Sequence, residues 1–290
     1  HGRDRAPALL ERPLAKHPRQ PIEHTFHSAR MPALPIRVWE SPLVPRAAQV
    51  TSFRHGQLNV SDKVVNLPGI QNFLGSSILA DNGAQLTLAG VTQMTRTNFG
   101  HLSITAYDEG TVVNLPNLAQ AGVQSGYFFE LTADAGGRID LPRLNQVNSA
   151  FDVYAGDLGS VVNLAGLNGA LGSGGFTSYL EVDNGGAILI PNVTALERFR
   201  VTIEGTGTIP MSQMTTIRNS NVLIDAATVV FSALSDTTGT QFQYENGGTG
   251  VFQPPADLIV NGIFVPSTIV ANQPFQAVWE IRNTGTAVTN

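Results

Sequence analysis

A motif of about 23 residues recurs along this chain and limits its fold more than any other feature. The clearest copy is Gly110–Leu118, with the sequence GTVVNLPNL. Successive copies are 20 to 27 residues apart, a spacing typical of solenoid proteins. Aligned on the central apolar residue, the eight copies are anchored at Leu67, Leu88, Leu115, Leu141, Leu164, Ile190, Met211 and Phe231.

Each copy has the pattern of a strand, a tight turn and a second strand. A glycine lies five residues before most anchors, and apolar residues lie two before and three after. Residues two apart share one face of a strand. Asp-x-Gly favours a turn, because Asp bonds nearby backbone amides and Gly accepts a positive φ. An acid lies seven residues before the anchor in each of the six middle copies. In chain order these acids are Asp81, Asp108, Asp134, Asp157, Asp183 and Glu204.

A single coil of this kind cannot bury its apolar face, whereas stacked coils bury a continuous core. We therefore predict an all-β fold, a right-handed parallel β-helix (β-solenoid) of about eight coils over residues 51–250. A leucine-rich repeat fits less well, because the sequence lacks its LxxLxLxxNxL motif and its helical return segment.

Two copies depart from the common phase. Before the acid, the apolar alternation of residues 102–106 and 151–155 is shifted by one residue relative to the other copies. Either a β-bulge absorbs this shift, or the alignment on the acid is locally wrong.

The first 50 residues form a different region. They hold eight of the 17 prolines, four of the six histidines and no apolar period. We interpret residues 1–50 as a Pro/Arg-rich leader or disordered linker. A basic arm, or a metal-binding tract built on His17, His24 and His27, is the alternative.

The charge of the repeat region argues against one class of partner. Residues 51–290 hold 9 Lys/Arg and 18 Asp/Glu, which gives a net charge of −9. Such a field repels nucleic acid. The chain has no cysteine, which excludes disulfides, and no apolar run reaches the ~18 residues of a membrane helix.

The apolar pattern changes again after a Gly/Pro-rich boundary at Tyr244–Pro255. Residues 256–290 contain Ala256-Asp257-Leu258, Pro266 and the run Val278–Thr286, VWEIRNTGT. This segment resembles the start of a CARDB domain, the immunoglobulin-like "cell adhesion related" module of bacterial surface proteins. The resemblance implies a partial β-sandwich, truncated here, within a larger bacterial surface or secreted protein.

The column of acids is the first candidate site. Stacked coils would place these carboxylates about 5 Å apart, where they could share calcium ions. We favour the simpler interpretation that each acid organises its own turn, because the calcium-binding repeat GGxGxD is absent. Calcium is the one cofactor considered, and its candidate ligands are Asp81, Asp108, Asp134, Asp157 and Asp183.

Aromatic residues are the second candidate site. If several of them face outward, they could form a platform for sugar rings, although core packing would explain them equally well. His55 and His101 are isolated in the sequence and are interpreted as surface or satisfied histidines. The aromatic candidates are Tyr107, Tyr127, Phe128, Tyr154, Tyr179 and Phe176.

Some parallel β-helices are polysaccharide lyases or hydrolases, so an enzyme is one alternative. Glycoside hydrolysis needs two carboxylates about 5–9.5 Å apart, and lyases of this fold use carboxylate-held calcium with an Arg or Lys base. The sequence alone does not bring the arginines of the repeat region together. They are Arg96, Arg138, Arg143, Arg198, Arg200 and Arg218.

We therefore expect a non-catalytic extracellular or cell-surface protein, a β-solenoid stalk that presents a binding surface for glycan or another cell. The alternatives are a polysaccharide lyase or hydrolase, and a structural spacer or fibre subunit. A spacer could also associate end to end, because the end coils of a solenoid are unpaired edges.

Overall fold

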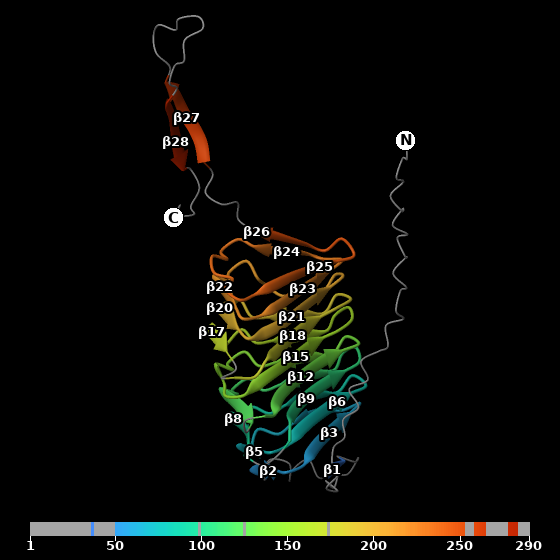
Figure 1. The fold of residues 1–290 in the computed structure, drawn as a ribbon. Helices are drawn as coiled ribbons and strands as arrows, with labels where there is room; N and C mark the ends of the chain where they lie inside the picture. The colour runs from blue at the N-terminus through green and yellow to red at the C-terminus, as the bar shows by residue number, and fades with distance from the viewer. Residues whose placement is uncertain are drawn as a thin grey trace, which may run out of the picture. The chain divides into compact units, whose positions relative to one another are not determined.

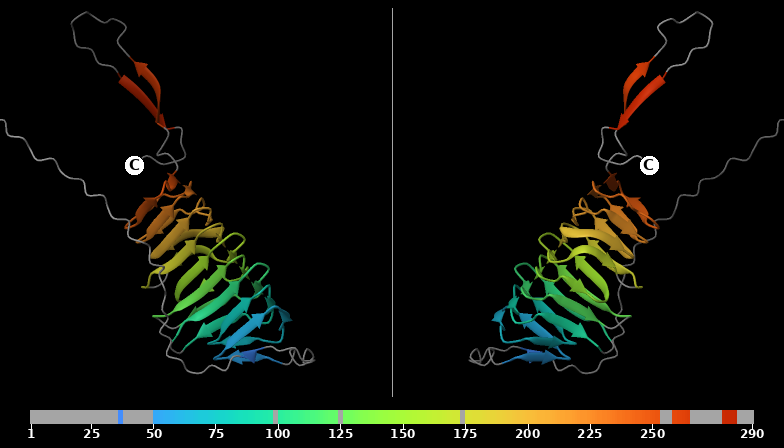
Figure 2. Two further views of the ribbon diagram at one scale, coloured as in Figure 1. Left: turned by 90° about the vertical axis from the view of Figure 1, so that its right-hand side faces the viewer. Right: turned by 90° about the vertical axis from the view of Figure 1, so that its left-hand side faces the viewer.

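The computed structural model describes residues 50–97, 100–123, 126–172 and 175–252, together with the strand residues 36–37, 258–264 and 278–283. These residues are all-β and contain no helix, and their parallel strands stack as a β-solenoid of about nine turns. Figures 1 and 2 show the stack from three sides. The prediction of a parallel β-solenoid is confirmed. Apart from residues 36–37, the predicted leader lies outside the described residues.

The longest sheet of the described residues has ten strands, and we call it the long sheet. It receives one strand from each turn, and its first strand is supplied by the segment before the repeats. The strands are β1 (Ile36–Arg37), β3 (Gln57–Ser61), β6 (Ser77–Asp81), β9 (Leu102–Tyr107), β12 (Phe128–Asp134), β15 (Ala150–Ala155), β18 (Ser178–Val182), β21 (Phe199–Glu204), β23 (Asn221–Asp225) and β25 (Gln241–Glu245).

Shorter strands form the other two walls of the solenoid. The second wall is a six-stranded sheet that ends at β19 and resumes as the pair β24–β26. Its strands are β4 (Val64–Asn66), β7 (Gln85–Thr87), β10 (Val112–Asn114), β13 (Arg138–Asp140), β16 (Val161–Asn163), β19 (Ala187–Leu189), β24 (Thr228–Phe231) and β26 (Thr249–Phe252).

The third wall consists of a five-stranded sheet and a three-stranded sheet. Its strands are β2 (Ser52–Arg54), β5 (Asn72–Leu74), β8 (Gln93–Arg96), β11 (Gln120–Val123), β14 (Gln146–Val147), β17 (Asn168–Gly172), β20 (Asn192–Glu197) and β22 (Thr216–Arg218). In all three walls the partners of each strand belong to neighbouring turns.

The anchors of the repeat form one column of the core. Leu115, Leu141 and Leu164 are fully buried, as are the apolar residues two positions before them. The register aligns these columns from turn to turn, for example Val113 with Ile139 and Ile139 with Val162. Each side chain therefore packs on its equivalents above and below.

The phase shift of two copies arises in the turn and not in the strand. Leu131 pairs with Ile104 and Asp134 pairs with Tyr107, so the alternation continues unbroken through β9. Ala80 pairs with Ala106 and Gln85 pairs with Val112, so the connection after β9 is one residue longer than the connection after β6. The extra residue lies in the turn that contains Asp108. The alignment on the acid is therefore wrong in these copies, and no bulge is present in β9.

The short turns use backbone that only a few residue types accept. Asn82 and Asn184 have φ of 53° and 43°, and a glycine of positive φ follows each. Asn and Gly are the residues that populate this left-handed region most readily. The same pair occurs at Asn246-Gly247, in a ninth turn that continues to Phe252. The Gly/Pro content of this stretch predicted a boundary, whereas the structure continues the solenoid to Phe252.

The C-terminal segment contains two described strands, β27 (Leu258–Phe264) and β28 (Val278–Asn283). They pair antiparallel, and the register shifts between Val260 and Gly262. The sequence predicted strands here. A single pair of strands does not test the resemblance to an immunoglobulin-like module, so that part of the interpretation remains a prediction.

Close packing of neighbouring turns makes Gly137 a sensitive position. A Cβ atom there would lie 2.2 Å from the backbone oxygen of Ala106. We expect Gly137→Ala to lower the free energy of unfolding by about 2 kcal/mol or more, because backbone must move to relieve the clash. Urea denaturation followed by circular dichroism measures this change.

Gly205→Asn is the matched control for this prediction. Gly205 has φ of 57°, and a Cβ atom added there would meet no other atom within 4 Å, so asparagine should change stability by less than about 1 kcal/mol. Equal losses in the two variants would contradict the packing argument.

Candidate functional site

The acids predicted as one column occupy two different places. Asp81, Asp134 and Asp183 are at or just after the ends of long-sheet strands. Asp108 and Asp157 lie one residue further into the longer turns, with φ of 75° and 66°. Alternate turns therefore place the carboxylate differently, and the five acids do not form a straight line of equivalent groups.

Most of these carboxylates accept hydrogen bonds at the turns. Asp134 Oδ1 accepts the N–H of Ala135 at 2.8 Å. Asp108 Oδ2 accepts the N–H of Asn82 in the preceding turn at 3.1 Å, and Asp183 Oδ1 accepts the N–H of Asp157 at 3.2 Å. These bonds support the turn role. Within the described residues no group of three or more His, Cys, Asp or Glu is placed to hold a metal ion, and calcium binding stays a prediction.

A variant of Asp183 distinguishes the turn role of these acids from calcium binding. Its carboxylate also accepts the hydroxyl of Tyr154 at 3.1 Å. We expect Asp183→Ala to lower the free energy of unfolding by about 1–3 kcal/mol through loss of these bonds, equally in calcium and in chelator. Thermal unfolding with and without calcium measures both effects. A calcium-dependent rise in the melting temperature of the wild type that Asp183→Ala abolishes would show that the column binds metal.

The outer face of the long sheet is the second candidate site. Residues alternate between the core and this face, so β12 buries Phe129, Leu131 and Ala133 and turns Phe128 and Glu130 outward. In the next strand Asp152 is the register partner of Glu130, and Tyr179 follows it on β18. Aromatic and acidic side chains therefore lie next to one another on adjacent strands.

The aromatic rings on this face contact each other. His101 stacks on Phe128 with ring centroids 5.6 Å apart and planes 3° apart, and Phe128 meets Tyr179 at 5.9 Å. Tyr127 meets the edge of His101 at 5.5 Å. We call His101, Tyr127, Phe128 and Tyr179 the aromatic group. Three of the six predicted aromatic residues are thus brought together.

The remaining predicted aromatics are placed differently. Tyr107 is 42% exposed, and its hydrogen bond to Asp134 raises its pKa to about 12. Burial, followed by the charge of Asp183, raises the pKa of Tyr154. Both hydroxyls thus remain protonated at neutral pH and face turn acids. Phe176 is 43% exposed.

His101 and Glu130 form a close pair beside the rings. His101 Nδ1 lies 2.8 Å from Glu130 Oε1 and also accepts the N–H of Phe128 at 3.2 Å. With a neutral His101 that accepts at Nδ1, the short contact is a hydrogen bond from the Glu130 carboxyl, and Nδ1 is shared between this donor and the Phe128 amide. Burial, with the charge on Asp152, raises the pKa of Glu130 to about 7, which agrees with a protonated carboxyl.

Arg96 is a positive group that contacts His101. Its Nη1 donates to the carbonyl oxygen of His101 at 2.7 Å. Burial, followed by the charge of Arg96, lowers the pKa of His101 and favours the neutral ring. Sequence analysis missed this cluster, because His101 and Glu130 are 29 residues apart and only the register of β9 and β12 brings them together.

Arg200 on β21 is the register partner of Tyr179, whereas three other arginines have partners elsewhere. Arg138 forms a two-bond pair with Asp140, at 2.6 and 2.7 Å, on the six-stranded sheet. Arg218 bonds Asp236, and Arg143 donates to Asn117 at 3.0 Å. In the described residues, Arg138, Arg143 and Arg218 bond these partners and do not contact the His101–Glu130 pair.

The raised pKa of Glu130 predicts a pH dependence. The folded state keeps a proton that the unfolded state releases near pH 4.5, so the stabilisation is complete below that pH and is lost as pH rises through about 7. Relative to Glu130→Gln, we expect wild-type stability to fall by on the order of 2 kcal/mol between pH 4 and pH 8. Urea denaturation at a series of pH values measures the difference.

Glu197→Gln on β20 is the control, since Glu197 is exposed and lies on another wall. Its unfolding free energy should follow that of the wild type at every pH. If Glu130→Gln also follows the wild type, Glu130 does not hold a proton in the folded protein.

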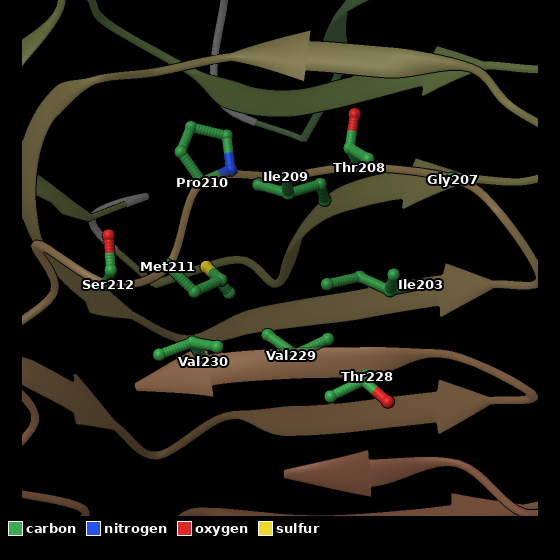
Figure 3. A pocket seen from close by; sticks show the side chains of 10 residues that line it. All are labelled: Ile203, Gly207, Thr208, Ile209, Pro210, Met211, Ser212, Thr228, Val229 and Val230. Atoms are coloured by element: carbon green, nitrogen blue, oxygen red, sulfur yellow. The ribbon is translucent and has the colours of Figure 1, made fainter. Parts of the chain in front are cut away.

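A cavity of about 210 Å³ lies between the seventh and eighth turns (Figure 3). Thr208 forms a bridge to Ala187, but β24 pairs only with β26, so the second wall is interrupted here. Gln213 Nε2 donates to the oxygens of Ile190 in the sixth turn and Pro210 in its own turn. The lining residues have no ionisable side chain, which gives this cavity no evident chemistry. They are Ile203, Gly207, Thr208, Ile209, Pro210, Met211, Ser212, Thr228, Val229 and Val230.

Comparison of the chain with family models, with curated proteins and with solved structures finds no match. The resemblance of residues 256–290 to a CARDB domain therefore rests on the residues alone. In the described part of the chain, no helix is long and apolar enough to span a membrane.

Proposed function

We propose that this chain is a non-catalytic surface protein that binds glycan on the outer face of its long sheet. The observation that carries the proposal is the aromatic group, with Glu130 and Asp152 beside it on a regular sheet. The CARDB-like segment adds support for a place outside the cell, at the bacterial surface. The solenoid would act as a stalk that holds this face in a fixed orientation.

The chemistry of the face suits sugars. Aromatic rings pack against the C–H faces of a pyranose, while carboxyl and imidazole groups bond its hydroxyls. The rings of His101, Phe128 and Tyr179 follow one another across strands β9 to β18, so several sugar units of a chain could be contacted in sequence. The acidic character of the repeat region disfavours uronate polymers and favours neutral or amino sugars.

A polysaccharide hydrolase is the second candidate, and one observation favours it. A carboxyl that is protonated near pH 7, paired in register with a second carboxylate, is the arrangement of a general acid with its partner. In this alternative Glu130 would donate a proton to the oxygen of the leaving sugar. Asp152 would act as the nucleophile or as the base that activates water. A spacer without ligand is the third candidate.

Incubation with a panel of neutral, amino and acidic polysaccharides tests the proposal, with retention and chain length both measured. We expect intact neutral or amino polymer to be retained. Tyr179→Ala should weaken retention about tenfold, because one lost stacking contact amounts to about 1.4 kcal/mol.

Leu158→Ala is the matched control, since Leu158 is 84% exposed in a turn away from the aromatic group and should leave retention unchanged. Shortened polymer would contradict the proposal and indicate the hydrolase, and Glu130→Gln should then abolish the shortening. If no polymer is retained or cut, the spacer becomes the better description.

A further inference from the structure

The last turn of the solenoid has an open edge. Among the described residues, β25 pairs with β23 and β26 pairs with β24, and neither has a partner on its other side. Tyr244 and Phe252 are 45% and 40% exposed. They continue columns that are fully buried one turn earlier, at Ile224 and Phe231. Their exposure thus follows from the lack of a further strand over them.

The opposite end is closed by strand addition. The segment before the repeats supplies β1, whose Ile36 and Arg37 pair with Leu58 and Asn59 of β3. In this first turn Leu58 and Val60 are only 2% exposed, although they occupy the same inward columns. Head-to-tail stacking of two copies would have to displace this strand. The open end of a second copy is the better partner.

Among the described residues, the open edge lacks the sequence features that commonly prevent strand pairing. Edge strands of soluble proteins are commonly blunted by Lys, Pro or a bulge. The strand β25, with the sequence QFQYE, contains neither residue, and it pairs with β23 in continuous register. Phe242 and Phe252 of the last turn contact each other, and both contact Phe231 of the turn before. An added strand would therefore extend both the ladder and the apolar core.

We propose that two copies of this chain associate through these ends, with β25 of one copy antiparallel to β25 of the other about Gln243. This register places Phe242 opposite Tyr244, two aromatic residues of the same inward face. It places Glu245 opposite Gln241, so like charges do not face each other across the pair. A two-fold contact of this kind uses the same edge on both copies and closes as a dimer without forming a filament.

The chain offers a sharp test because it contains no cysteine. Gln243 lies at the proposed two-fold axis and is exposed, so Gln243→Cys should meet only its own equivalent in the second copy. Under mild oxidation we expect most of the full chain to form disulfide-linked dimers. Leu158→Cys, exposed in a turn of the fifth coil, is the control and should remain mostly unlinked.

Sedimentation equilibrium of the unmodified chain is the second measurement. The mass should rise from 30.8 kDa towards about twice that value with concentration, and Gln243→Lys should weaken the association at least tenfold. A monomer at all concentrations would overturn the proposal, and would indicate that residues 253–290 of the same chain cover the edge. Dimers that Gln243→Lys leaves unchanged, or a cross-linking rate no higher than that of Leu158→Cys, would also overturn it. Polysaccharide retention plays no part in either measurement.

Discussion

The parallel ladder between successive turns is the interaction on which the whole structure depends. The strands of the second wall are three or four residues long, too short to be stable alone. Stacking gives each one hydrogen bonds to its neighbours and places its apolar side chain in a continuous column. Stability therefore accumulates from contacts between neighbouring turns, and the ladders of the long sheet continue from β3 to β25 without a register shift.

The same register creates the proposed binding face. Side chains more than 20 residues apart in the chain become neighbours about 5 Å apart on the sheet. His101, Glu130 and Asp152 come from three consecutive turns and share one short stretch of surface. The burial that raises the pKa of Glu130 is thus a property of the stack and not of any one repeat.

The sequence predicted the architecture because each turn repeats the same local chemistry. Asn82-Gly83 and Asn184-Gly185 have the residues that left-handed turns need, and the leucine anchors have the period of the core. It did not predict the extra residue in the turn of Asp108, since an alignment on the acid hides a change in turn length. It also missed the ninth turn, where Gly250 replaces the usual apolar residue before Phe252. The His101–Glu130 contact requires the register of strands, which no local pattern supplies.

The interruption beside Pro210 has a mechanical consequence. At the junction of the seventh and eighth turns, the second wall contributes no ladder in the described residues and the third wall contributes a single bridge, so the long sheet supplies the main ladder there. Proline has no amide hydrogen to donate, and Gln213 Nε2 donates to Ile190 of the sixth turn and to Pro210 of its own turn, so neither bond reaches the eighth turn. When the stalk bends or is pulled along its axis, strain will concentrate at this junction, and the solenoid will behave as two stiff rods joined by a more compliant seam.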